Sequence, residues 1–312
     1  MGVWYIISAE AGAGKTAISA GLAVNLLSAG KKVGFLKPQA VDKTLPDGDT
    51  AFMKKVLGPD DLVNAPDIVK GRDTVLVEAL LGKKPGDAAS KDAYGAAKEM
   101  QAKAIAVEAY TGQPSPYISL YKGFGESLLG VIINKVPQSQ LKRVKAEAAA
   151  QFGEAGIKVL GAIPESRALL ALTIGEVAAG IRGKILNNAD KAGELVENYL
   201  LGAMTLDAGP VYFGRKSHKA AILRLDRPDM QLAALETSTA CLVLSGGGQP
   251  PIYNVISKAE SKGVPVITTD SAVPDIVTGI ENALMKTRLH QEKKLARLAE
   301  IVKQNLDMKV FG

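Results

Sequence analysis

Short apolar runs and longer amphipathic stretches alternate along most of the chain. In the first half, the runs have the length and composition of buried strands, and apolar residues between them recur roughly every three to four positions, as in helices. The predicted strands are 3–8, 33–37, 73–78, 104–109, 129–135 and 157–163, and the predicted helices are 16–29, 49–57, 92–101, 115–127 and 138–152. This alternation indicates the α/β class, with a doubly wound and mostly parallel sheet.

The pattern restarts after a break near residue 182. Thr173 and Glu176 have the spacing of a capping box, which predicts a short helix to Ile181, and the next three residues are typical of a boundary. Beyond it, strands are predicted at 185–187, 220–224, 240–245 and 264–268, and helices at 205–214, 228–237, 252–262 and 273–286. We therefore expect a nucleotide-binding domain at 1–182, a smaller α/β domain at 184–287 and a basic helix in 288–312.

The C-terminal helix carries an apolar stripe made of Leu295, Leu298, Val302 and Leu306. Residues at this spacing lie on one face of a helix. The stripe fits a homodimer contact or a helix packed on its own chain, and the pattern leaves both interpretations open.

Composition and charge narrow the classes of function. The 312 residues are enough for two domains, and the 47% hydrophobic content supplies sizeable cores. The net charge of +6 is mild, and no basic run is interleaved with aromatic residues. Nucleic acid is therefore not expected as a partner, and anionic nucleotides account for a mild basic bias equally well.

Cysteine usage and hydropathy indicate a cytoplasmic protein. Cys241 is the single cysteine and lies inside an apolar run, which fits a reducing compartment. The apolar runs, about six to nine residues long, fall well short of the roughly 20 needed to span a bilayer. Because the chain begins directly with a predicted strand, we expect neither a signal peptide nor a membrane partner.

The segment 8–16 has the sequence of a phosphate-binding P-loop between a predicted strand and a predicted helix. Gly12 and Gly14 let the backbone curl so that N–H groups point at phosphate oxygens. Lys15 can reach the terminal phosphates and Thr16 can ligate Mg²⁺. The expected contacts with ATP are Glu10, Ala11, Gly12, Ala13, Gly14, Lys15, Thr16 and Ala17.

One departure from the P-loop pattern is Ala9, which replaces the usual first glycine. A methyl group is tolerable there if the residue keeps a negative φ. The alternative interpretation of the segment is a glycine-rich turn that binds nothing.

Polar residues end several other predicted strands at the edge where open α/β sheets bind ligands. Lys37 is either a surface lysine or a contact to phosphate or substrate. Asp49 fits a helix N-cap or a Mg²⁺ ligand, and Glu78 fits a solvated acid or a Walker B carboxylate on Mg²⁺. Asn134 could present its amide to an adenine edge, while Glu108 is a weaker candidate acid.

Together these segments resemble dethiobiotin synthetase and its relatives among the P-loop ATPases. The matching segments, in the family's order, are 9–16, 33–38, 48–50, 75–78, 130–134 and 160–165. The resemblance implies phosphate contacts from Lys15 and Thr16, with Lys15 and Lys37 as catalytic lysines. It also implies Mg²⁺ ligation by Thr16, Asp49 and Glu78, and adenine recognition by Asn134 and the 162–165 loop, which contains Pro164 and Glu165.

The remainder resembles a DRTGG-type domain, as found behind a synthetase-like domain in long bacterial phosphotransacetylases. The segments that carry this resemblance are 196–204, 226–229, 231–238 and 263–266. It implies a regulatory domain, and no segment of this sequence resembles the phosphotransacetylase catalytic domain. The candidate ligand residues of this domain are Asp226, Arg227, Asp229, Gly246 and Gly247.

Two functions from different classes follow. In the first, the chain is a nucleotide-gated regulatory protein that binds Mg-ATP and a small-molecule effector. In the second, it is an ATP-dependent ligase that activates a carbamate or carboxylate with the γ-phosphate and then forms a C–N bond. The residues after Glu78 lack the synthetase's glycine-rich turn, and the 38–78 connection is short. These altered substrate segments, beside an intact nucleotide motif, favour regulation.

Glu10 bears on the mode of nucleotide binding. It stands where deviant P-loop ATPases carry a lysine that reaches across a dimer. A nucleotide sandwiched between two copies in that style is therefore not expected.

Overall fold

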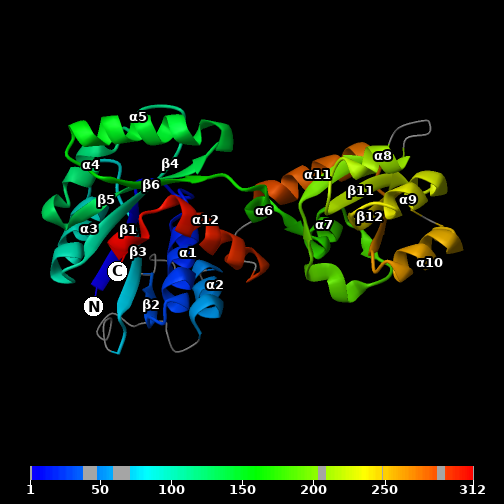
Figure 1. Cartoon of the computed structure of the whole chain (residues 1–312), viewed down its shortest axis with the longest axis horizontal. Helices are drawn as coiled ribbons and strands as arrows, with labels where there is room; N and C mark the ends of the chain where they lie inside the picture. The colour runs from blue at the N-terminus through cyan, green and yellow to red at the C-terminus, as the bar shows by residue number, and fades with distance from the viewer. Residues whose placement is uncertain are drawn as a thin grey trace. The chain divides into compact units, whose positions relative to one another are not determined.

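The chain forms two compact units. The computed structural model describes residues 2–37, 48–58, 71–202, 209–247, 249–286 and 292–311. The first unit contains the chain up to Ser166 together with the C-terminal segment, and the second begins at Arg167 (Figure 1). Among the described residues, no helix is both long and apolar enough to cross a membrane.

The first unit is built on a six-stranded sheet of order β2-β3-β1-β4-β5-β6, and its strands pair in parallel. The strands are β1 (Gly2–Ser8), β2 (Val33–Leu36), β3 (Thr74–Leu80), β4 (Lys103–Ala109), β5 (Leu128–Val136) and β6 (Val159–Pro164). Because β1 lies between β3 and β4, the strand order reverses beside it. The carboxyl end of β1 is thus a switch point of the kind at which open α/β sheets bind ligands.

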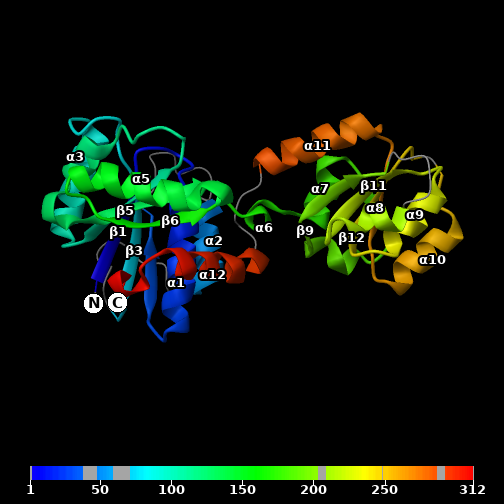
Figure 2. The same cartoon turned by 45° about the horizontal axis from the view of Figure 1, so that its top comes forward.

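Helices cover both faces of this sheet (Figures 1 and 2). One face carries α3 (Ala88–Glu99), α4 (Ile118–Lys122) and α5 (Leu141–Glu154), and the other carries α1 (Lys15–Ser28), α2 (Gly48–Leu57) and α12 (Leu295–Asn305). Successive side chains of β1 point to opposite faces of the sheet, so Tyr5 and Ile7 join the core under α3–α5. Trp4 points to the other face, where its ring packs edge-on against that of Phe311 with the ring centroids 5.0 Å apart. The doubly wound α/β fold predicted from the sequence is confirmed.

The C-terminal helix α12 packs on α1 within the first unit, as Figures 1 and 2 show. Leu298 and Val302 are buried at this contact, and Asn25 Nδ2 on α1 donates to the Ala299 carbonyl at 2.9 Å. The apolar stripe of the tail is therefore used inside the chain. Of the two interpretations left open by the sequence, packing on its own chain is the one observed.

Gly21 is the point of closest approach between α1 and α12. A Cβ there would lie 2.5 Å from Cγ2 of Val302, a fully buried residue whose branched side chain is stiff at χ1. Such overlap costs about 1–3 kcal/mol, against a helix-propensity gain of ~1 kcal/mol for Gly→Ala. We expect Gly21→Ala to lower the free energy of unfolding measured with urea.

The matched control is Gly95→Ala on α3, where an added Cβ meets nothing within 4 Å. There the propensity gain acts alone, so we expect stabilisation by about 0.5–1 kcal/mol. Equal gains from both variants would contradict the close packing of α12 on α1.

The second unit has a five-stranded sheet of order β10-β11-β12-β13-β8, parallel except for β8. Its strands are β8 (Lys184–Ile185), β10 (Asn198–Leu201), β11 (Lys219–Arg224), β12 (Thr239–Ser245) and β13 (Val266–Thr269), and β7 (Leu172–Thr173) pairs with β9 (Leu195–Val196). The sequence pattern predicted four strands of the larger sheet but missed β10.

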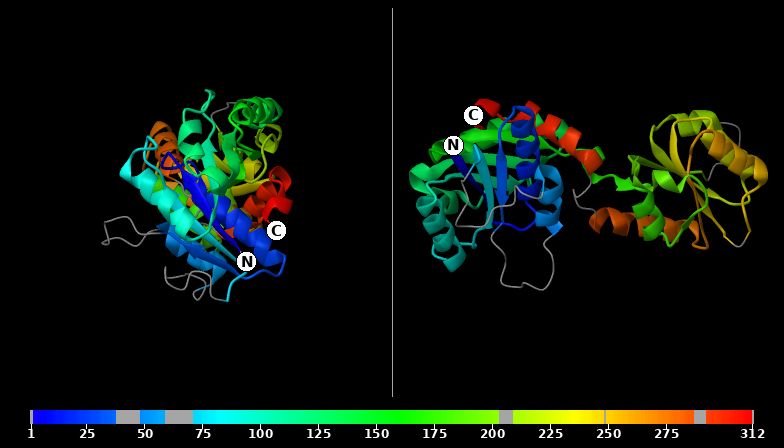
Figure 3. Two further views of the ribbon diagram at one scale, coloured as in Figure 1. Left: turned by 90° about the vertical axis from the view of Figure 1, so that its left-hand side faces the viewer. Right: turned by 90° about the horizontal axis from the view of Figure 1, so that it is seen from below.

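Helices also cover both faces of the second sheet (Figure 3). One face carries α8 (Gly209–Gly214), α9 (Pro228–Leu235) and α10 (Tyr253–Ser261), and the other carries α7 (Ile174–Gly180) and α11 (Val273–Lys286). Ile222 and Val243 belong to the core under α7 and α11, while Leu223 and Leu244 belong to the core on the opposite face. A second α/β domain is therefore present.

The boundary between the two units lies earlier than residue 182, where we expected it. The capping box at Thr173 is present and begins α7, as predicted. However, α7 packs against α11, and its residues Ile174 and Val177 belong to a core of the second unit. The chain therefore divides after Ser166.

The remaining helical segments are short. They are α6 (Arg167–Leu170) and the 3₁₀ turns η3 (Gly125–Ser127), η4 (Gln138–Gln140), η5 (Ala189–Gly193), η6 (Glu292–Lys294) and η7 (Met308–Phe311).

Candidate functional site

The predicted P-loop follows β1 and leads into α1 at Lys15. Gly12 and Gly14 have φ values of 76° and 97°, in the left-handed region that favours glycine. A Cβ at Gly14 would lie 2.1 Å from Asn134 Nδ2, so a larger residue is excluded there on two grounds. Ala9 is not among the residues with positive φ, and its methyl group is accommodated as expected.

The other predicted phosphate-loop residues lie along this turn and the first turn of α1. Glu10, Ala11 and Ala13 belong to the loop, and Thr16 and Ala17 follow Lys15 in the helix. The loop thus lies between a strand and a helix N-terminus, which is the place where P-loops bind anions.

Lys15 is held at the loop by a serine that the sequence analysis did not single out. Its Nζ donates to Ser8 Oγ at 2.8 Å, and this hydroxyl in turn donates to the Glu10 carbonyl at 2.8 Å. Burial lowers the pKa of Lys15, Lys37 adds to this effect, and the Glu78 and Asp49 carboxylates oppose it. A half-buried ammonium that donates to one neutral hydroxyl is well placed to exchange that partner for a phosphate oxygen.

Glu78 on β3 lies beside the P-loop threonine, as the Walker B pattern predicts. Thr16 Oγ1 donates to Glu78 Oε2 at 3.0 Å, and the glutamate is 2% exposed. Burial raises the pKa of the Glu78 carboxyl, while the hydroxyls of Ser19 and Thr16 and the charge of Lys15 act against this rise. Glu78 is therefore a buried acid at the P-loop and not a solvated strand end.

Lys37 and Asp49, which are predicted to join the same site, form an ion pair of 2.6 Å. Each side chain is about a quarter exposed (27% and 26%). Lys37 directly follows β2 and Asp49 lies in the first turn of α2, and both residues act on the pKa of Lys15. The structure thus brings together the four charged residues expected there: Lys15, Lys37, Asp49 and Glu78.

The donor set fits a hard divalent cation. Glu78 Oε1 is buried and has no hydrogen-bond partner among the described residues, and the Thr16 hydroxyl contacts the other oxygen of the same carboxylate. Hydroxyl and carboxylate oxygens are ligands that Mg²⁺ prefers. The described residues contain no group of three His, Cys, Asp or Glu side chains that could hold a metal ion without further help. Water and phosphate oxygens would therefore complete the shell, as is usual for Mg²⁺.

Asn134 at the end of β5 braces the P-loop. Its side-chain Nδ2 donates to the Ala13 carbonyl at 2.9 Å, and its backbone carbonyl accepts from the Tyr110 amide at 2.8 Å. This contact fixes the loop and comes from a residue that we expected to contact adenine. The role in adenine recognition stays a prediction.

A polar pocket of about 480 Å³ opens beside Asn134, at the carboxyl ends of β4, β5 and β6. Its wall contains a small network in which Gln140 Oε1 accepts from Tyr110 and from Arg143, at 3.0 and 2.7 Å. Its lining residues are Tyr110, Thr111, Gly112, Lys135, Pro137, Gln140, Arg143 and Glu165. Glu165 is one of the two predicted adenine contacts beyond β6, and Pro164 is the last residue of that strand.

A second polar cluster adjoins the P-loop and includes a tyrosine that the sequence analysis missed. Tyr117 Oη donates to the Glu10 carboxylate, which raises the pKa of Tyr117 to about 12. Glu108 accepts from Ser115 at 2.7 Å and from Tyr121 at 3.1 Å, and burial raises its pKa. Glu108 is thus occupied by hydroxyl partners. The sequence signal for the cluster was the acid that ends β4.

In the second unit, the predicted ligand residues lie beyond β11 and β12. Arg227 is paired with Asp229 through two hydrogen bonds of 3.0 and 2.7 Å, and Asp226 is paired with Arg224. An anionic ligand at Arg227 would therefore compete with a carboxylate of the same loop.

Glycines after β12 bring that turn close to the end of β13. Gly246 has a φ of 88°, and a Cβ on Gly247 would lie 2.2 Å from Asp270 Oδ1. Gly247 also donates its amide to the Thr269 carbonyl at 3.0 Å. The turn is thus a close-packed part of the edge at which a parallel sheet binds ligands.

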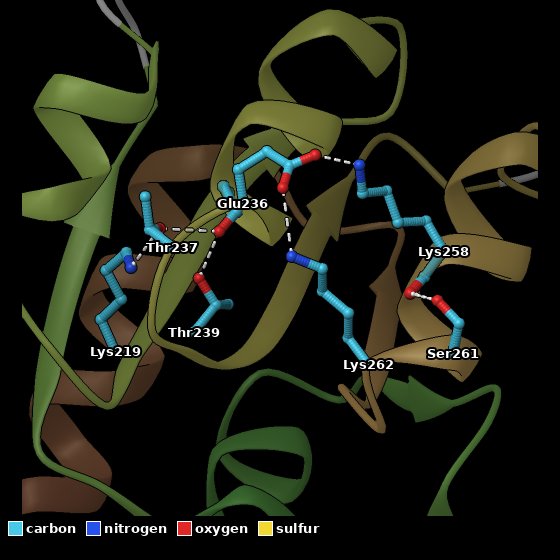
Figure 4. A network of polar contacts seen from close by, with 8 residues as sticks. Lys219, Glu236, Thr237, Thr239, Lys258, Ser261 and Lys262 are labelled. Carbon is cyan, nitrogen blue, oxygen red and sulfur yellow. Dashed lines mark hydrogen bonds and ion pairs between the residues drawn. The ribbon is translucent and has the colours of Figure 1, made fainter.

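A polar network at the opposite end of these strands has a structural role (Figure 4). Lys219, which begins β11, is fully buried and donates to Thr237 at 2.8 Å, and burial lowers its pKa to about 8. Nearby, Glu236 after α9 pairs with Lys258 and Lys262 of α10 and its end. These contacts join α9, α10 and β11 away from the candidate ligand edge.

Comparisons with known proteins also divide the chain into two parts, with a boundary near residue 175. The family profile described as the CobQ/CobB/MinD/ParA nucleotide binding domain matches residues 4–174, and the DRTGG domain profile matches residues 176–283. Phosphate acetyltransferase of Pseudomonas putida (strain KT2440) is 27% identical over 323 aligned positions, which cover 88% of this chain and 43% of that protein. The chain thus spans less than half the length of this curated relative.

Two solved structures resemble parts of the chain. One contains the CBS and DRTGG domains of the regulatory region of Clostridium perfringens pyrophosphatase, complexed with the activator diadenosine tetraphosphate; it is 18% identical, covers 40% of this chain and 53% of that chain, and has a TM-score of 0.33. The other is the MinD cell division protein of Aquifex aeolicus, which is 18% identical, with 55% and 84% of the two chains covered and a TM-score of 0.37.

These matches do not distinguish dethiobiotin synthetase from other members of the family. The synthetase-type specificity expected from the sequence therefore stays a prediction. The first profile spans more than half of the chain, and it covers β1, the P-loop, Glu78 and Asn134. The protein therefore belongs to the CobQ/CobB/MinD/ParA family of nucleotide-binding domains, here followed by a DRTGG domain.

Proposed function

We propose that the chain is a nucleotide-gated regulatory protein, in which the first unit binds Mg-ATP and the DRTGG unit binds a small effector. The observation that carries the proposal is the contact between Thr16 and Glu78 at the mouth of the P-loop, where the second oxygen of Glu78 is buried and has no partner in the part of the chain that the structure describes. Lys15 supplies a cation for the terminal phosphates, and Mg²⁺ when bound neutralises charge on them.

The adenine of ATP would occupy the pocket beside Asn134. That pocket lies at the same edge of the sheet as the P-loop, and Asn134 contacts both the loop and Tyr110 of the pocket wall. Its volume of about 480 Å³ is within the usual range for small-molecule sites.

The segment after β3 favours regulation over catalysis. An enzyme of the synthetase type needs polar groups there that converge on the γ-phosphate. Instead, the Asp87 carboxylate accepts from the backbone amides of Lys83 and Lys84 at 2.7 and 2.9 Å, and the Ser90 hydroxyl accepts from the Gly82 amide. These groups stabilise their own turn. The other segment that bears on this choice, residues 38–47, lies outside the described residues.

The effector site would lie at the carboxyl edge of the second sheet, around Arg227 and Gly247. The match to a phosphate acetyltransferase over 43% of its length supports a role in acyl-phosphate or cofactor metabolism. The effector would be a small anion, most simply a nucleotide or an acyl phosphate, because Arg227 can exchange Asp229 for another oxyanion.

The alternative is an ATP-dependent ligase, and one observation favours it. Lys37 and Asp49 lie beside Lys15, where they could orient a second substrate and the γ-phosphate. Under this alternative, a diamine or carboxylate supplied with bicarbonate stimulates steady ATP turnover.

The deciding experiment uses the full chain. Calorimetry measures binding of Mg-ATP, and then of AMP and acetyl phosphate to Lys15→Ala, in which the P-loop site is disabled. We expect one of these two probes to bind Lys15→Ala and to lose affinity when Arg227→Ala is added. In the wild type, ATP and the probe should change each other's affinity by the same factor, typically about five- to 150-fold.

Two outcomes would overturn the proposal. If the wild type does not bind Mg-ATP, the proposed nucleotide site in the first unit is wrong. Substrate-stimulated ATP turnover, without binding of either probe to Lys15→Ala, would replace regulation with the ligase.

A further inference from the structure

Two buried polar atoms, one on α1 and one on β3, have no hydrogen-bond partner among the residues that the structure describes. One is Ser19 Oγ on α1, in a residue with no exposed surface, and the other is Glu78 Oε1 on β3, in a residue that is 2% exposed. The two elements pack against each other. A buried polar atom without a partner costs free energy, so two such atoms in one place point to an arrangement that a ligand completes.

Ser19 and Thr16 both act on the carboxylate of Glu78. They are three positions apart on α1 and therefore lie on one face of the helix. The Thr16 hydroxyl already donates to Glu78 Oε2 at 3.0 Å. The Ser19 hydroxyl acts against the rise that burial causes in the pKa of Glu78, and among the described residues it has no partner in hydrogen-bond geometry. The Thr16 hydroxyl is thus already hydrogen-bonded to Glu78, and the Ser19 hydroxyl is available as a second donor.

We propose that Ser19 is a positioning residue, whose hydroxyl donates to Glu78 when the magnesium nucleotide binds and so fixes the carboxylate that faces the cation. The inference rests on the proposed function, because it needs a cation beside Thr16 and Glu78. When the Thr16 oxygen ligates the cation, the hydrogen bond from Thr16 is no longer sufficient by itself to fix the orientation of the Glu78 carboxylate. Ser19, one turn further along α1, is the second donor for that group.

A second hydrogen bond to the carboxylate, formed as the cation binds, stabilises the bound orientation of the ligand oxygen. This role differs from a structural one. A structural serine stabilises the protein without ligand, whereas Ser19 has no partner until the site is filled.

The test variant is Ser19→Ala, studied in the full chain. Without ligand, we expect its thermal unfolding temperature to equal or exceed that of the wild type, because the deleted hydroxyl has no partner and alanine is the better helix former. In calorimetry, its affinity for ATP with Mg²⁺ should fall about three- to tenfold. Its affinity for ATP in EDTA should not change, and Ser19→Thr should restore the magnesium-dependent part.

The matched control is Ser28→Ala on the same helix. Ser28 is exposed and donates only to the Val24 carbonyl at 2.8 Å, so both affinities should stay at the wild-type values.

The outcomes separate this inference from the proposed function. If the wild type binds ATP equally with and without Mg²⁺, the metal part of the proposed function fails, and the role of Ser19 fails with it. If the wild type depends on Mg²⁺ but Ser19→Ala retains that dependence in full, only the inference is wrong. A loss of unfolding temperature without ligand, or an equal loss of affinity with and without Mg²⁺, would assign Ser19 a structural role instead.

Discussion

Lys15→Ala is expected to weaken Mg-ATP binding by about ten- to a hundredfold while leaving the protein folded. The ammonium lies at the carboxyl end of β1, where burial already lowers its pKa, and the hydrogen bond found for it is to Ser8 Oγ. A half-buried charge whose hydrogen bond goes to a neutral hydroxyl contributes little to stability, so its removal should cost little. Calorimetry gives the affinity, and circular dichroism with thermal unfolding gives the fold.

The control for this change is Lys142→Ala on α5, which removes the same charge from an exposed position. It should retain wild-type affinity, because a surface charge away from the site acts only through screened, long-range attraction. Unchanged affinity in Lys15→Ala would rule out the P-loop as the nucleotide site. Unfolding of Lys15→Ala would instead show that the lysine supports the structure.

The features that were predictable from sequence depend on short stretches of chain. The strand predicted at 3–8 is observed as β1 at Gly2–Ser8, and the helix predicted at 16–29 is α1 at Lys15–Ser28. Apolar periodicity and glycine chemistry act within one element, so they are visible without knowledge of the fold. The convergence of Lys15, Lys37 and Glu78 followed from a single rule, because carboxyl ends of parallel strands share one edge.

Features that depend on distant partners were not predictable. Asn134 braces Ala13 from 121 positions away, and nothing local to either residue indicates the contact. Tyr117, just before α4, likewise contacts Glu10 from 107 positions away.

The boundary near residue 182 was misplaced for the same reason. A capping box shows where a helix begins and does not show which core that helix joins. Helix α7 belongs to the second unit because Ile174 and Val177 join the same core as Ile276 of α11, a contact that lies about 100 positions away along the chain.

Glu78→Gln is expected to raise the stability of the metal-free protein at pH 8 and to weaken the contribution of Mg²⁺ to ATP binding. Burial raises the pKa of Glu78 in the folded protein above its unfolded value, so folding takes up a proton at intermediate pH. Wild-type stability therefore falls as pH rises from the unfolded pKa through the folded one, because the charged form must be buried. Glutamine keeps the shape and an oxygen for Thr16 without the charge. Without metal, the variant should be more stable than the wild type at pH 8, and this difference should disappear in acid.

The same substitution should reduce the gain in ATP affinity that Mg²⁺ provides by about tenfold, or ~1.4 kcal/mol, since a neutral amide is a poor ligand for a hard cation. Binding in EDTA should change little. Glu108→Gln is the matched control: it also removes a strand-end acid whose pKa burial raises, but one whose partners are Ser115 and Tyr121 instead of Thr16. Equal loss of affinity with and without Mg²⁺ in Glu78→Gln, or an equal effect of both glutamine variants on the Mg²⁺-dependent gain, would mean that Glu78 is a buried strand-end acid with no part in holding the cation.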